Sequence, residues 1–278
     1  AMVVPDYLIY TMTGSVATDR TYGSRTLLMN LASGQWDDEL CSLFSIEKDK
    51  LCSLIEVGEV AGQVSESFAA ATGLTAGTPV VTAGGDQQCA ALGLGVFDPS
   101  AVAINCGTGA YAIGVSDVPI LDNPGIICNR ASVPGKYIVE ASVSRCATAL
   151  NAFITQTYPE FGGDMERLNH EVEFGTDQRA KQARALYESV AAGIADCVAR
   201  IPHGEQITCY LSGGVSNSDI FNRILAKAVG HPLIRWNDPE ATAIGAFISG
   251  AVALGVYPDY DAAFQAARAE DTKAVYLP

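Results

Sequence analysis

Apolar residues recur every three or four positions between about residue 177 and residue 200, and this spacing predicts one long amphipathic helix. The apolar positions of this helix are Ala183, Leu186, Val190, Ile194, Cys197, Val198 and Ile201. Short apolar runs before and after it predict strands at 101–105, 110–115, 137–143, from Gln206 to the next Gly-Gly pair, and at 231–236. Further helices are expected at 144–156, 165–173, 218–229, 240–255 and 259–269. This mixture of strands and helices indicates an α/β protein.

The first 77 residues show a different pattern, with helices, short loops and too little strand to make a sheet. Helices are expected at 4–12, at a segment opened by Trp36–Leu40, at 47–54, and at 65–72, the last capped by Ser65 and ended by Gly73. No residues of this region suggest a particular chemistry. The helices must therefore pack against something else.

A strand followed by a glycine turn and a helix is expected at 79–96. Pro79–Ala83 is a β-branched run that predicts a buried strand, and Gly84-Gly85 ends it. Asp86 stands where the helix 87–96 begins. Its carboxylate has two interpretations: an N-cap that accepts backbone N–H bonds, or a general base at the carboxyl end of a strand, where open α/β sheets bind ligands. One residue is able to do both.

Two more glycine turns follow. The first, Cys106–Ala110, joins two predicted strands through Gly107-Thr108-Gly109. It is either a plain hairpin turn that uses glycine for positive φ, or a phosphate loop in which backbone N–H groups and the Thr108 hydroxyl approach an anion.

The second, Leu211–Ser218, runs from a strand through Gly213-Gly214 into a helix, with Asn217 and Ser218 at the helix start. This arrangement suits a nucleotide, because backbone N–H groups and a helix N-terminus face the ligand. It is not a Walker A loop, since no Gly-Lys-Ser or Gly-Lys-Thr follows, and a tight strand–helix turn remains the alternative. Small residues in 241–246 indicate close packing of the next helix against the sheet.

Composition narrows the function classes. The formal net charge is −14, which argues against nucleic acid or an anionic membrane as a main partner. The longest apolar stretch, 241–256, is too short to cross a bilayer, and the first residues do not resemble a signal peptide. The eight cysteines include no C-x-x-C pair and the three histidines lack metal-ligand spacing. We therefore expect buried, reduced thiols in a cytoplasmic protein and no metal site made of protein ligands.

Taken together and in this order, the motifs resemble those of the FGGY carbohydrate kinases, which include xylulose, ribulose, gluconate and glycerol kinases. The matching pieces are Pro5–Leu8 with Thr13-Gly14, Ser24-Arg25-Thr26, Gly84–Gln87, Ala91–Gly93, Gly107–Gly109, Ser212–Gly214 and Glu240–Ala246. The resemblance implies an actin-like ATPase (ribonuclease H-like) fold, with ATP and Mg²⁺ bound between two α/β domains.

Carried onto this sequence, the family pattern assigns roles to single residues. Asp86 is implied to be the general base that takes the proton of the sugar hydroxyl, and Gln87 to hold a neighbouring hydroxyl. The β- and γ-phosphates are implied to lie on Gly107, Thr108 and Gly109. The residues implied to lie against adenosine and the α-phosphate are Gly213, Gly214, Asn217 and Ser218, and Asn222 is implied to edge the adenine pocket. These parts suit phosphoryl transfer, which depends on positioning and on charge stabilisation.

Two parts of the family pattern are absent from the sequence. One is the opening strand with its Asp-containing phosphate loop, and the other is a Gly-Glu-Arg-x-Pro-like loop, since Glu173 is followed directly by Phe174. We therefore expect the C-terminal, ATP-binding domain at 98–278 and a remnant of the N-terminal, sugar-binding domain at 1–97. A missing sheet also predicts exposed apolar surface on helices 4–12 and 65–72, and hence a tendency either to form a homodimer or to bind the missing lobe.

Two function hypotheses follow. The first is an ATP-dependent kinase of a ketose or polyol, of the xylulose type in Ser24-Arg25-Thr26 and closer to glycerol kinases in Asp86-Gln87-Gln88. The second is a non-catalytic nucleotide-binding or assembly module of the actin-like fold, which has no need of the Asp86 carboxylate. A dehydrogenase-type domain is disfavoured, because no G-x-G-x-x-G follows the first strand.

Overall fold

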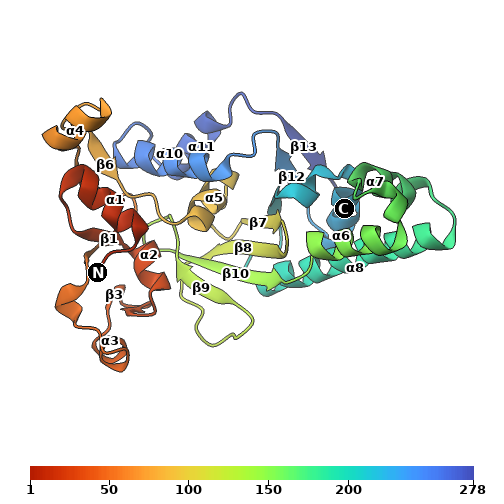
Figure 1. Cartoon of the computed structure of the whole chain (residues 1–278), viewed down its shortest axis with the longest axis horizontal. Coiled ribbons are helices and arrows are strands. Elements are labelled where there is room, and N and C mark those ends of the chain that lie inside the picture. Colours follow the sequence, from red (N-terminus) through yellow and green to blue (C-terminus); the bar gives the residue numbers. More distant parts are fainter.

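A computed structural model describes all 278 residues of the chain, and a seven-stranded mixed sheet lies at its centre (Figure 1). The strand order is β13-β12-β11-β7-β8-β10-β9. The bounds are β7 (Ala101–Cys106), β8 (Ala110–Ser116), β9 (Ile127–Arg130), β10 (Tyr137–Val143), β11 (Thr208–Ser212), β12 (Leu233–Trp236) and β13 (Lys273–Tyr276). Strand β11 pairs in parallel with β7 and β12, and the other neighbours are antiparallel. The five strands expected in this region are confirmed, whereas β9 and β13 were not foreseen.

Helices cover both faces of this sheet. They are α5 (Asp86–Leu94), α6 (Ala147–Thr157), α7 (Met165–Phe174), α8 (Gln178–Arg200), α9 (Asp219–Val229), α10 (Ala241–Ala253) and α11 (Tyr260–Ala267). Successive β7 residues point to opposite faces, so Val102 and Ile104 pack with α8 and α9, while Ala101 and Ala103 pack with α5. Figure 1 shows α5, α10 and α11 on one side of the sheet and α8 on the other. The helices predicted after residue 86 are all confirmed.

The residues before 86 form a separate, looser region. It holds helices α1 (Val4–Thr13), α2 (Arg20–Arg25), α3 (Asp38–Leu43) and α4 (Glu66–Thr72), and a short 3₁₀ turn, η1 (Lys48–Lys50). Its strands are β1 (Ala17–Asp19), β2 (Met29–Asn30), β3 (Gln35–Trp36), β4 (Ser53–Ile55), β5 (Val60–Gln63) and β6 (Pro79–Val81). They make only two-stranded sheets, β1 with β4, β2 with β3, and β5 with β6. The expected helices 4–12 and 65–72 are confirmed, including the Ser65 cap and the Gly73 end.

Two expectations for this region are wrong. No helix spans 47–54, because the chain leaves the η1 turn to place β4 beside β1 in parallel register. That pairing joins residues more than 30 positions apart, and local pattern does not reveal it. Strand β6 is not buried either: it pairs only with β5, and Pro79 is exposed.

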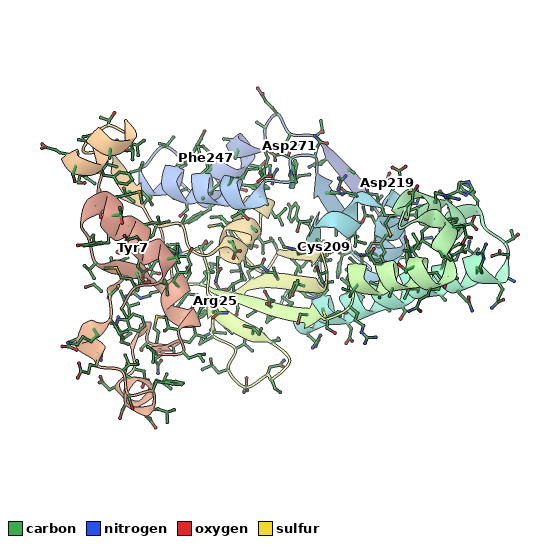
Figure 2. All side chains as sticks on the ribbon, viewed as in Figure 1. Tyr7, Arg25, Cys209, Asp219, Phe247 and Asp271 are labelled. Atoms are coloured by element: carbon green, nitrogen blue, oxygen red, sulfur yellow. The ribbon has the colours of Figure 1, made fainter.

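Apolar side chains are exposed on α1, as expected. Val4, Tyr7 and Leu8 are each more than half exposed, and α4 contains no buried residue. Figure 2 shows Tyr7 on α1 and Phe247 on α10, and Phe247 is likewise exposed.

The cysteines lie mostly in the interior. Figure 2 shows one of them, Cys209, which is wholly buried in the sheet. All eight cysteines are free thiols and seven are buried, which confirms the expectation of buried, unpaired thiols. None of the helices combines the length and the apolar character that a membrane span needs.

Candidate functional site

The glycine turns at Cys106–Ala110 and Leu211–Ser218, the second and third of the chain, lie side by side at one edge of the sheet. Strands β7 and β11 are parallel and in register up to Asn105 and Ser212, so the turns that follow them meet. Gly213 has φ +86°, and a Cβ at this position would lie 2.6 Å from the Cys106 carbonyl oxygen. Only glycine permits this close approach of the two turns.

The turn between β7 and β8 is a hairpin, but its glycines do not serve positive φ. The Gly107 N–H donates to the Gly109 carbonyl at 2.9 Å, and neither residue lies in the left-handed region. Gly109 is required for another reason, because a Cβ there would lie 2.8 Å from the Val143 carbonyl oxygen. The expectation of positive φ was therefore wrong, and close backbone packing explains Gly109.

Backbone N–H groups of both turns are left without partners in the chain. Helix α6 begins on the hairpin turn: the Ala147 N–H donates to the Gly107 carbonyl at 3.0 Å and the Cys146 N–H to the Thr108 carbonyl at 3.1 Å. The turn's own N–H groups at Thr108 and Gly109 donate to nothing in the chain, and neither do those of Gly213 and Gly214. Clustered free N–H groups of this kind form an anion-binding site.

A cavity of about 400 Å³ opens beside these turns. It is lined by Cys106, Gly107, Thr108, Ala147, Leu150, Asn151, Met165, Glu166, Asn169, Gly214, Val215, Asn217 and Ser218. The residues from α6 and α7 were not foreseen, because they belong to no glycine motif and their helices showed only amphipathic spacing. Aliphatic walls and a few polar groups are typical of a small-molecule site.

The other residues singled out near the third turn hold the turn in place. Ser218 caps α9 by accepting from the Phe221 N–H at 3.2 Å. Asn222 is wholly buried and donates to the Ser216 carbonyl at 2.7 Å, so it supports the turn from beneath rather than lining the cavity. Arg235 donates to the Asn217 side-chain oxygen at 2.5 Å across a second hollow of about 330 Å³, which shares Gly214 and Asn217 with the first.

Asp86 lines a different cavity, of about 250 Å³, with Val3, Tyr22, Arg25, Thr26, Gly85 and Gln88. Asp86 is exposed and is the first residue of α5, because Gly85 occupies the N-cap position. The N-cap interpretation of Asp86 is therefore wrong. Its Oδ1 accepts only from the next N–H, that of Gln87, at 2.8 Å. Gln87 does not line the cavity, whereas Gln88 does.

Side chains from distant segments fix the turn before Asp86. Gly84 has φ +93°, the Tyr22 hydroxyl donates to its carbonyl at 3.1 Å, and Thr21 accepts from the Gly85 N–H at 3.1 Å. The Ser132 hydroxyl donates to the Ala83 carbonyl at 2.8 Å. Burial, and then the charge of Asp19, raises the pKa of Tyr22 to about 12, so this phenol stays a hydrogen-bond donor at neutral pH.

The structure does not bring Asp86 together with the second and third glycine turns, which are called the phosphate-type turns below. The Asp86 turn contacts Ser132 and, through Gln88, the Arg130 carbonyl. In the sheet, Arg130 on β9 pairs with Tyr137 on β10, and Tyr137 pairs with Ser116, the last residue of β8. The 107–109 turn adjoins the other end of β8, at Ala110. That strand spans about 20 Å. Figure 1 accordingly shows α2, next to β9, near one end of the β8–β10 pair and α6 near the other end.

Sequence comparison decides the family. The models of the N-terminal and C-terminal domains of the FGGY family of carbohydrate kinases match residues 1–93 and 161–254, which together make up more than half of the chain. The chain belongs to the FGGY family. Its solved relatives have the actin-like ATPase fold, and the expected fold class is confirmed.

Named relatives within the FGGY family act on different substrates. The autoinducer-2 kinase of Escherichia coli is 26% identical over 303 residues, which include 92% of this chain and 57% of that protein. The glycerol kinase of Haloferax volcanii is 25% identical and matches 93% of this chain and 58% of its own length. This FGGY chain thus spans little more than half the length of the curated relatives it matches.

Among solved structures, xylulose kinase from Rhodospirillum rubrum superposes on this FGGY chain with a TM-score of 0.88 at 24% identity. It matches 99% of this chain and 62% of its own. Plasmodium falciparum glycerol kinase with ADP superposes with a TM-score of 0.83 at 20% identity, covering 99% of this chain and 62% of that one. At these identities the likeness establishes the fold.

Proposed function

We propose that the chain is an ATP-dependent carbohydrate kinase, or the greater part of its catalytic machinery, that transfers the γ-phosphate of ATP to a hydroxyl of a xylulose-type ketose or a polyol. The observation that supports this most is the row of free N–H groups at Thr108, Gly109, Gly213 and Gly214 beside the 400 Å³ cavity. We assign the sugar to the unit 1–97 and the nucleotide to the unit 98–278.

The nucleotide roles follow from the turns. We assign the β- and γ-phosphates to the turn Gly107–Gly109, through the free N–H groups of Thr108 and Gly109 and the Thr108 hydroxyl. We assign the α-phosphate and adenosine to Gly213, Gly214, Asn217 and Ser218, of which the last three line the 400 Å³ cavity. Asn222 keeps the third turn in shape by holding the Ser216 carbonyl. Backbone donors fixed in this way stabilise phosphate charge without reorganising during the reaction.

Mg²⁺ fits this site as an ion carried by the nucleotide. No group of three or more His, Cys, Asp or Glu side chains is placed to hold a metal ion. Mg²⁺ usually keeps several waters and is held by substrate phosphates with one or two carboxylates. When bound, it neutralises phosphate charge, and we assign no residue of the chain to it.

On the sugar side, we assign Asp86 as the general base. The family pattern gives a neighbouring hydroxyl to Gln87, but Gln88 is the glutamine that lines the Asp86 cavity, so Gln87 takes this role only if the substrate extends beyond that cavity. The Asp86 carboxylate is exposed to its cavity and accepts only one hydrogen bond, so it is free to take the proton of an incoming hydroxyl as the oxygen attacks the γ-phosphorus. The bond from the γ-phosphorus to the bridging oxygen breaks, and ADP leaves. Because the two cavities lie at opposite ends of β8, this transfer requires the two units to approach each other.

The separation of the two cavities also favours the second candidate, a nucleotide-binding or assembly module without turnover. The Asp86→Asn variant separates the two functions, since Asn retains the oxygen that accepts from the Gln87 N–H. A kinase loses about 10²–10⁴-fold in turnover when its base is removed. Asp259→Asn is the matched control, because Asp259 caps α11 away from both cavities.

The experiment combines calorimetric titration of MgATP with turnover assays on xylulose, glycerol and autoinducer-2. We expect ATP to bind, one substrate to strengthen that binding, and turnover to disappear in Asp86→Asn only. ATP binding without turnover on any sugar would favour the module. Equal turnover in Asp86→Asn and Asp259→Asn would remove Asp86 from the mechanism.

A further inference from the structure

One side chain in the nucleotide cavity has its hydrogen-bonding direction fixed by two buried partners. Asn169, on α7, accepts from the Tyr187 hydroxyl at 2.8 Å and from the Ser218 hydroxyl at 2.7 Å, both at its Oδ1. Tyr187 is wholly buried on α8, and Ser218 caps α9. Three helices therefore converge on a single amide oxygen.

These contacts decide which way the amide faces. A carbonyl oxygen has two lone pairs, and the two hydroxyls occupy both of them. Turning the amide over would make both hydroxyls accept from its N–H₂ and would leave their own protons, including that of wholly buried Tyr187, without an acceptor in the chain. The Nδ2 donors are thus left without any partner in the chain, and Asn169 lines the cavity.

The surroundings suit a flat heterocycle. Leu150, Met165 and Val215 supply apolar walls from three different elements. Glu166 also lines the cavity, lies one turn before Asn169 on α7, and pairs with no cation in the chain. One helix therefore presents a carboxylate acceptor and an amide donor three residues apart, on the same side of the helix.

We propose that Asn169 is a base-reading residue, which donates from Nδ2 to a ring nitrogen of adenine while Glu166 accepts from the exocyclic amine. This inference rests on the proposed function, since it concerns the nucleotide that the same cavity holds. Adenine offers both groups on one edge, an acceptor nitrogen beside an amine, and a site built to pair them rejects bases that lack either. Asn169 is thereby a specificity-determining residue that the glycine motifs do not include.

The first test compares ATP with its 1-deaza and 7-deaza analogues, each of which replaces one ring nitrogen by C–H. For the wild-type chain we expect one of the two to bind about tenfold more weakly than ATP, the size of one hydrogen bond to a buried partner. Equal binding of ATP and both analogues would overturn the inference without any variant being made. Purine riboside triphosphate, which lacks the amine, tests Glu166 in the same way.

The second test uses Asn169→Asp, which retains an oxygen for Tyr187 and Ser218 and loses the N–H donors. We expect weaker ATP binding and no remaining discrimination against the analogue that the wild type rejects. Asn123→Asp is the matched control: Asn123 is exposed, and its oxygen accepts from the Gly125 N–H at 3.0 Å, so it undergoes the same chemical change outside the cavity. Thermal melting checks that both variants fold.

The outcomes separate the two proposals. If the wild-type chain binds no ATP, the proposed function and this inference fail together. If it binds ATP but Asn169→Asp binds and discriminates as the wild type does, only the inference fails.

Discussion

Gly93 on α5 and Gly245 on α10 face each other where the two helices cross. A Cβ on Gly93 would overlap the Ala241 carbonyl oxygen, and a Cβ on Gly245 would overlap the Cys89 carbonyl oxygen. The backbones are therefore in direct contact. Because α5 begins at Asp86 and α10 follows β12, this crossing packs the helix that carries Asp86 directly against a helix of the central sheet.

Gly245→Ala is expected to destabilise the chain by about 3 kcal/mol or more, the upper end of overpacking costs, because backbone atoms cannot move aside as a side chain does. Urea unfolding measures the change. Gly250→Ala is the control on the same helix, since a Cβ added there would have no neighbouring atom within 4 Å. Alanine there is expected to gain up to about 1 kcal/mol. Equal effects of the two substitutions would contradict the close crossing.

The same crossing shows which part of the packing the sequence predicts and which part it does not. The small residues of 241–246 predicted close packing, but against the sheet, whereas the partner is α5. Periodicity reveals that one face of a helix is apolar, and not which element covers that face. The glycine turns were recognisable because their backbone requirement is local. Asn169 was not, because its role depends on Tyr187 and Ser218, which lie 18 and 49 residues away.

The N-terminal region was predicted less well for a related reason. Its strands are two to four residues long and are defined by pairing rather than by pattern, as β1 and β4 show. In the central sheet, burial of both faces leaves long apolar runs in the sequence, and these runs correctly predict β7, β8, β10, β11 and β12. The position of Asp86 relative to the phosphate-type turns was beyond the sequence, because it depends on how the units pack.

Gly213→Ala is expected to abolish ATP binding and to lower stability by about 1–3 kcal/mol, because Gly213 has φ +86° and ψ 163°, a region that only glycine adopts readily. The added methyl also collides with the Cys106 carbonyl. Gly162→Ala is the control, with φ +62° but open space around it, and is expected to bind ATP as the wild type does. Calorimetry and thermal melting measure the two effects. Intact ATP binding in Gly213→Ala would remove the third turn from the nucleotide site.

Arg268→Met is expected to cost about 3–5 kcal/mol, since it leaves a buried carboxylate without its partner. Arg268 and Asp271 pair at 2.7 Å with side chains 2% and 10% exposed, and the guanidinium also donates to the Gly93 carbonyl at 2.9 Å. Arg179→Met breaks a pair with Glu160 that is about half exposed, and we expect little change there. Urea unfolding compares the two variants, and similar losses in both would show that burial of the Arg268 pair is not decisive.

The thiols are expected to be nearly inert in the folded chain. Seven are buried, and burial raises the pKa of Cys89 to about 11, so little thiolate forms at neutral pH. Only Cys128 is partly accessible, and burial raises its pKa as well. A chromogenic disulfide reagent is expected to titrate at most one thiol in the native chain and all eight in denaturant. Rapid reaction of several native thiols would show that the sheet and its helices open readily.

Asp19 and Asp37 are expected to give opposite pH dependences of stability. Both cap short helices, Asp19 through the Thr21 and Tyr22 N–H groups and Asp37 through those of Glu39 and Leu40. Burial raises the pKa of the Asp19 carboxyl above 3.8, while the hydrogen bonds from Leu40 and Asn30 lower the pKa of the Asp37 carboxyl. Asp19 thus holds its proton more tightly when folded, and its contribution to the free energy of unfolding falls as pH rises above 3.8.

For Asp37 the sign is reversed: its contribution is present above pH 3.8 and is lost as pH falls through its lower, folded-state pKa. Asparagine caps both helices without titrating. Relative to the wild type, Asp19→Asn is therefore expected to become more stable as pH rises above 3.8. Asp37→Asn is expected to be less stable than the wild type above pH 3.8, and this deficit is expected to disappear as pH falls below 3.8. Urea unfolding at a series of pH values measures both differences. Parallel curves for the two variants would mean that the buried position of Asp19 does not set its ionisation.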